Sequence, residues 1–166
     1  TCLAAAERAY TWAKANPAIY YKNPADISTG AYDDTFLSDE FFWASAELGL
    51  ATGNASMVSG KELMDQKIMV PSWDYSGMNG ILSLALSEGT SFETLRTLAQ
   101  KQLFRYVDQL VSKAQQSPYH VSIDFFKWGS NSDVANIAVL KLVAARISNN
   151  PVYYKSVQDD LDYLLG

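Results

Sequence analysis

The sequence repeats one arrangement three times: a long loop, a helix that is apolar on nearly every side, a short turn, and a more polar helix. The apolar helices are predicted to begin near Ser38, Asp74 and Asn131. A helix that is apolar all round has to be buried, whereas an amphipathic helix covers a core with one face. Each repeat is therefore predicted to form an αα-hairpin whose first helix is buried and whose second helix faces solvent.

The hydrophobic spacing predicts seven helices and gives no segment a convincing strand alternation. Ser38 is expected to cap the second helix, and Thr90 with Glu93 has capping-box spacing at the start of the fifth. Pro151 suits a first helical position. The expected ranges are 2–15, 38–51, 57–69, 75–87, about 90–114, about 131–147 and 152–165.

A tight turn that carries Trp128 opens directly into the sixth helix. The residues at 131–133 are Asn, Ser and Asp, and each can accept a hydrogen bond from the free N–H groups of a first helical turn. Trp43 and Trp73 lie near the starts of the other two apolar helices. Packed side by side, the hairpins place the apolar helices in an inner ring and all long loops on one rim. This pattern resembles an α/α toroid, although a generic α-bundle with buried tryptophans has the same periodicity.

The composition excludes several classes of function. An apolar content of 48% and a charged content of 19% are typical of a globular chain, and the length suits one domain, spanning residues 1–166. The net charge of −5, without a basic cluster, argues against a nucleic-acid partner. No apolar run is long enough to span a membrane. Because Cys2 and His120 are the only cysteine and histidine, a cysteine zinc site and a two-histidine metal site are excluded, and no cofactor is predicted.

Several segments resemble glycoside hydrolase family 9, the endoglucanases and related β-glycosidases. The resemblance covers nearly the whole chain, and it implies an incomplete (α/α)6 toroid of the all-α class. It also implies inverting hydrolysis of β-linked glucan or its oligosaccharides, in a secreted or periplasmic protein. The segments that carry it are Thr29-Gly30-Ala31-Tyr32-Asp33-Asp34, residues 39–48 with Ala51-Thr52-Gly53, Trp128-Gly129-Ser130-Asn131-Ser132 with Asn136, and Leu161-Asp162-Tyr163-Leu164-Leu165-Gly166.

The chain departs from the family in its catalytic residues. An inverting mechanism needs a general base and a general acid with a water between them. In the family these are an aspartate in an Asp-Ala-Gly-Asp segment before the matched part and a glutamate after it. The sequence has no Asp-Ala-Gly-Asp segment. We therefore expect a central fragment of the catalytic domain that supplies part of the sugar cleft, has no catalytic residue of its own and is inactive alone.

Five residues are the substrate-binding candidates. By resemblance, Trp128 borders the family's cleft and offers an indole face for a pyranose ring, with core packing as the alternative. Trp73 and Asp74 resemble a cleft-lining segment more loosely. Tyr32 lies on the first long loop, and His120 lies on a loop that can reach the rim, without an evident nucleophile beside it.

The neighbouring acids are interpreted structurally. Asp39 and Glu40 fall in a first helical turn, where acids are favoured by the helix dipole. Asp33-Asp34 fits a turn, and a cation site made by this pair with loop carbonyls is the alternative. Trp12 and Trp43 lie within predicted helices and are expected to pack.

Two further expectations concern partners. An incomplete toroid leaves apolar faces open at its edges, so homo-oligomers are expected along with an oligosaccharide or polysaccharide substrate. The alternative from another class is a noncatalytic carbohydrate-binding or scaffold module, and a different glycosidase or a lyase with a toroid fold is a third reading. The residues on either side of this stretch in the gene would separate these readings.

Overall fold

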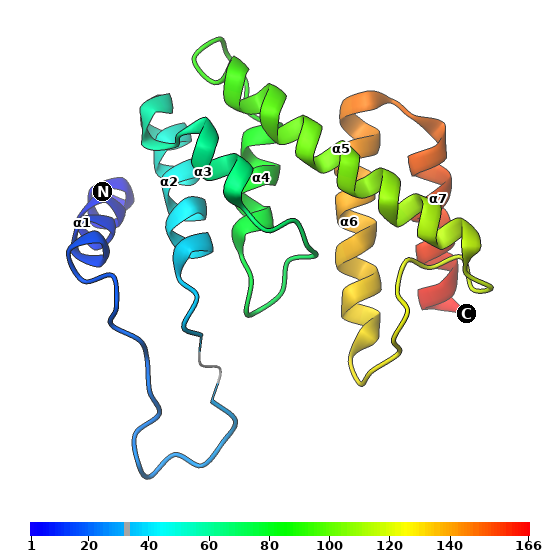
Figure 1. Cartoon of the computed structure of the whole chain (residues 1–166), viewed down its shortest axis with the longest axis horizontal. Coiled ribbons are helices and arrows are strands. Elements are labelled where there is room, and N and C mark those ends of the chain that lie inside the picture. The colour runs from blue at the N-terminus through cyan, green and yellow to red at the C-terminus, as the bar shows by residue number, and fades with distance from the viewer. Residues whose placement is uncertain (32–33) are drawn as a thin grey trace.

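The computed structural model describes residues 1–31 and 34–166, and its described part is all-α, as the sequence predicts. Figure 1 shows the helices in order. None of the described helices is both long and apolar enough to cross a membrane. The helices are α1 Cys2–Ala15, α2 Ser38–Thr52, the 3-10 helix η1 Ala55–Met57, α3 Gly60–Asp65, α4 Gly77–Ala85, α5 Glu93–Gln116, α6 Ser130–Ser148 and α7 Pro151–Leu165.

The hairpin arrangement places the long connections together. Helices α2, α4 and α6 stand roughly upright, and α5 runs across α4 and α6, against both of which it packs (Figure 1). Packing continues from α2 to α4 and from α6 to α7. The described parts of the three long loops, 16–37, 66–76 and 117–129, hang from one end of the upright helices, whereas short turns join the other end (Figure 1). The fold is a partial toroid with the predicted loop-bearing rim.

The sequence predicts the presence of the helices more accurately than their first residues. The amide of Glu93 donates to the backbone carbonyl of Thr90, so α5 begins later than its capping-box spacing suggests. Ser38 lies inside α2 and does not cap it. The helix expected over 57–69 is only η1 and α3, and the observed capping box is formed by Ser59 and Glu62. Pro151 occupies the first position of α7, as predicted.

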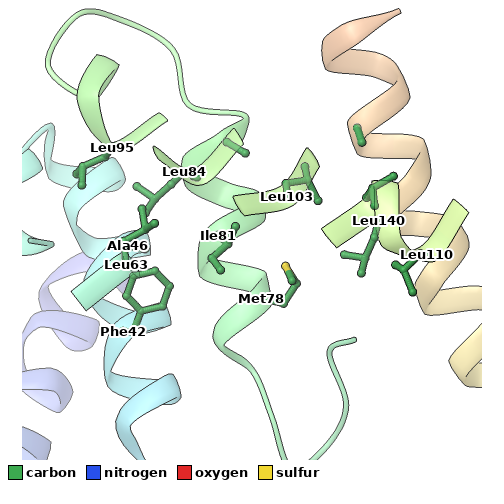
Figure 2. Packing of buried hydrophobic residues seen from close by; sticks show 14 of the residues in the cluster. Phe42, Ala46, Leu63, Met78, Ile81, Leu84, Leu95, Leu103, Leu110 and Leu140 are labelled. Carbon is green, nitrogen blue, oxygen red and sulfur yellow. The ribbon is translucent and has the colours of Figure 1, made fainter. Parts of the chain in front are cut away.

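The core joins the inner helices to α5. Figure 2 shows Phe42 and Ala46 of α2 near Ile81 and Leu84 of α4, while Leu140 of α6 packs beside α5. The close approach of α2 and α4 depends on Gly80, because a Cβ added there would lie 2.8 Å from the Phe42 ring and 3.1 Å from the Trp43 backbone. The α2–α4 contact therefore requires a glycine at this position.

One ion pair is buried within the described core. Lys141 Nζ of α6 lies 2.7 Å from Asp160 Oδ2 of α7, and neither side chain is exposed. Burial lowers the pKa of Lys141 and raises that of Asp160, and the contact between the two groups opposes both shifts. The pair joins the two helices of the last hairpin across their interface.

Helix α2 is buried on only one side, so the expectation of burial all round is wrong. Its open side and α1 form a groove of about 470 Å³ that includes Ala9, Phe41 and Ala44. No residue of α1 is fully buried. Trp12 on this helix is 59% exposed and Trp43 is 37% exposed, so the expected packing of both is not observed.

Candidate functional site

The turn before α6 presents Trp128 to solvent. The Ser130 amide donates to the Lys127 carbonyl at 3.0 Å, which closes a four-residue turn around Trp128 and Gly129. Gly129 has φ 80° and ψ 6°, values found at the third position of a type II turn, where glycine avoids a Cβ clash. The Trp128 side chain is 99% exposed. Local backbone chemistry therefore holds a large apolar ring outside the core.

The polar residues after this turn do not act as the predicted caps. Gly129 occupies the N-cap position of α6, and no side chain caps the helix. Ser132 instead donates its hydroxyl to the Gly129 carbonyl at 2.7 Å. Asp133 pairs with Lys127 across the turn, with 3.2 Å between Oδ2 and Nζ. The turn is thus braced on both sides of Trp128 by side chains expected to serve the helix amides.

A long-range hydrogen bond ties α6, the helix that follows this turn, to the loop that carries Trp73 and Asp74. Asn136 of α6 donates to the carbonyl of Pro71 at 3.0 Å. Trp73 is 65% exposed, and exposed Asp74 accepts from the Ser72 hydroxyl. The structure therefore fastens the loop that carries Trp73 to α6, the helix that follows the Trp128 turn.

The remaining candidates lie elsewhere. His120 is exposed and has φ 54°, and it lines a hollow between α5 and α7 that includes Ser156 and Asp159 but neither Trp73 nor Trp128. Tyr32 lies outside the described residues, as does Asp33 of the alternative cation site. The structure thus joins α6, which follows the Trp128 turn, to the loop of Trp73 and Asp74, whereas His120 lines a separate hollow.

Three carboxyl groups gather where the first long loop enters α2. One oxygen each from Asp34, Asp39 and Glu40 lies within 4.8 Å of the others. Asp39 is fully buried, and its Oδ2 accepts hydrogen bonds from the Ser76 amide and hydroxyl at 2.6 and 3.3 Å. Buried oxygens of all three carboxyl groups lack a hydrogen-bond partner. The structural role expected for Asp39 therefore includes a link to the start of α4, beyond its place in the helix dipole.

The three acids form a cradle suited to a hard cation. Burial raises the pKa of Glu40 to about 7, and the carboxyl of Asp39 and the charge of Asp34 add to the effect. Buried oxygens without donors are costly unless a donor or cation satisfies them. Hard divalent cations such as Ca²⁺ take oxygen ligands of this kind. From the sequence, the alternative cation site is assigned to residues 33–34 instead, because Asp39 and Glu40 are interpreted only by their position in the first turn of the helix.

We expect Ca²⁺ to stabilise the chain through these acids. A ligand present at about 100 times its dissociation constant adds about 2.7 kcal/mol to the stability of the state that binds it. Thermal unfolding with and without Ca²⁺ should show this increment in the unmodified chain. The increment should vanish in Asp39→Asn and persist in Asp26→Asn, which changes an exposed acid on the same loop. An equal increment in both variants would exclude the cradle.

Comparisons of the sequence with known proteins all point to one protein family. The family described as glycosyl hydrolase family 9 matches residues 1–166. A xyloglucan-specific endo-beta-1,4-glucanase of Bacteroides ovatus is 31% identical over 183 residues, covering 99% of this chain and 31% of that protein. A cellodextrinase of Butyrivibrio fibrisolvens is 25% identical over 176 residues, covering 95% and 32%. The chain thus spans about a third of the length of these relatives.

Comparisons with solved structures point to the same family as the sequence comparisons. A thermostable endoglucanase from Alicyclobacillus acidocaldarius, solved as a single mutant, has a TM-score of 0.88 at 30% identity, covering 99% of this chain and 32% of that one. The structure of AaCel9A with a cellobiose-like isofagomine has a TM-score of 0.83 at 28% identity, covering 96% and 31%. Together with the match to residues 1–166, they show that the chain belongs to glycosyl hydrolase family 9.

Proposed function

We propose that this chain forms part of the sugar cleft of an enzyme that hydrolyses β-linked glucan or its oligosaccharides by inversion. The observation that carries the proposal is the fully exposed Trp128 ring, held by a glycine turn at the start of α6, which is itself fastened to the loop of Trp73. An aromatic face is a stacking surface for the apolar side of a pyranose. The names of the relatives, a xyloglucan-specific endoglucanase and a cellodextrinase, support a β-glucan substrate.

We propose further that the chain binds sugar without cleaving it. An inverting enzyme needs one carboxyl group to protonate the leaving oxygen and a second to activate water. Two acids of the candidate segments are engaged: Asp133 pairs with Lys127, and Asp74 accepts from the Ser72 hydroxyl. Asp39 is fully buried. These engagements support a binding role for this part of the cleft, with the catalytic pair supplied by other parts of the toroid.

The proposal includes one partial toroid domain over residues 1–166 and action outside the cytoplasm, where polymeric glucans occur.

The proposal also includes self-association of the isolated chain. The α1–α2 groove is almost wholly apolar, and Val139 and Leu142 are 52% and 47% exposed on α6. Open apolar faces of this kind favour association. Apolar contact between the α6 strip of one copy and the α1–α2 groove of a second copy would join two different surfaces, which is a head-to-tail arrangement.

Titration with cello-oligosaccharides should quench tryptophan fluorescence saturably in the unmodified chain. Trp128→Ala should weaken binding at least about tenfold, because the stacking surface is lost. Trp12→Ala is the matched control, since Trp12 is also exposed but lies on α1. Unchanged affinity in the Trp128 variant would remove Trp128 from the site.

Pure chain incubated with cello-oligosaccharides should release no new reducing ends above the buffer background. The reason is that neither Asp74 nor Asp133 stands free to serve as acid or base. Measurable turnover that disappears in Asp74→Asn or Asp133→Asn would contradict the division between binding and catalysis.

Light scattering should give a dimer or larger species for the isolated chain at micromolar concentration. Ala9→Lys combined with Ala44→Lys places charge in the α1–α2 groove and should shift the distribution to monomer. Thr97→Lys, on an exposed part of α5, is the control and should not. A clean monomer of the unmodified chain would reject the association.

A further inference from the structure

A second hollow lies beside the Trp128 turn. It has a volume of about 320 Å³ and is bounded by α5, by Val70, by the segment 122–127 and by the first turns of α6. We call it the Phe125 pocket, after the aromatic residue on its wall. Lys127 lines it and directly precedes Trp128, whereas Trp128 itself does not. Val70 precedes Pro71, whose carbonyl is bonded to Asn136, so the far wall is fastened to α6.

The pocket wall keeps an aromatic ring in solvent. The Phe126 ring contacts Tyr119 and Tyr163 of α7, with centroid distances of 5.9 Å and 6.2 Å, and is 48% exposed. Its neighbour Phe125 remains 74% exposed. The contact between Phe126 and Tyr163 links this segment to α7, and the Phe125 ring stands in solvent beside it. An exposed ring beside a hollow offers a stacking face to a ligand.

Two ion pairs line the same pocket. Lys113 Nζ lies 2.5 Å from Asp124 Oδ2, and Lys127 Nζ lies 3.2 Å from Asp133 Oδ2. Exposed pairs of this kind contribute little to folding stability. Each pair offers ammonium donors and carboxylate acceptors with no net charge. Such walls match a neutral ligand with many hydroxyl groups, whereas an anion or a cation would have to break one pair.

The volume limits the ligand to a small one. A hollow of about 320 Å³ lies at the lower end of the range for small-molecule sites. We propose that the Phe125 pocket holds a single neutral sugar ring that branches from a β-glucan backbone lying on Trp128. The inference rests on the proposed function, and it specifies a substituted glucan as the substrate class.

The test is calorimetric titration of the chain with cellotetraose and with the same backbone carrying xylose branches. The branched ligand should bind roughly tenfold more tightly, the gain expected from filling a small pocket. Phe125→Ala and Asp124→Asn should abolish this preference and leave cellotetraose affinity unchanged. Tyr154→Ala, an exposed aromatic on α7, is the control and should keep the preference.

Each outcome bears on a different claim. Equal affinity for both ligands overturns the branch pocket and leaves the proposed function standing. A preference that survives both Phe125→Ala and Asp124→Asn, with folding confirmed by circular dichroism, also overturns the pocket. Failure of the chain to bind either ligand overturns the proposed glucan site and this inference together.

Discussion

The buried pair of Lys141 and Asp160 is the interaction on which the geometry of the last hairpin depends. Two opposite charges with no solvent access have to meet closely, because each is costly to bury alone. Removing one partner of such a pair typically costs about 3–5 kcal/mol. A pair of apolar residues tolerates sliding, whereas this contact fixes α6 along α7. It thereby also fixes the position, along the axis of α7, of the N-terminal end of α6, which directly follows the Trp128 turn.

The sequence predicted the helices well because the periodicity of apolar residues follows the buried face of each helix. It predicted the first residues of the helices poorly because several nearby acceptors compete for the same capping position. Ser132 and Asp133 have the chemistry of caps, yet one bonds to Gly129 and the other to Lys127. Local composition does not rank these partners. The Trp128 turn was recognisable because Gly129 carries the backbone requirement itself, through a positive φ.

The parts of the site that sequence reasoning missed depend on contacts between distant segments. Asp39 bonds to Ser76, which lies 37 residues further along, and Asn136 bonds to Pro71 across 65 residues. Asn136 was noticed as part of a motif, but its partner had no sequence signal. Glu40 was judged by its place in a helix, whereas Asp34 reaches it from the loop. Rules for helix capping and helix dipoles describe neighbours within one helix, and they do not predict which loops fold back onto that helix.

Stability and recognition are separated along this chain. The contacts that hold the fold, such as the approach at Gly80 and the Lys141–Asp160 pair, are buried and tolerate little change. The rim carries exposed aromatic rings and exposed ion pairs, which contribute little to folding. Under the proposed function, substitutions at the rim therefore change glucan selectivity without unfolding the scaffold. Because Gly129 and the Asn136–Pro71 bond hold the rim backbone in place, such changes act on side chains presented in a constant geometry.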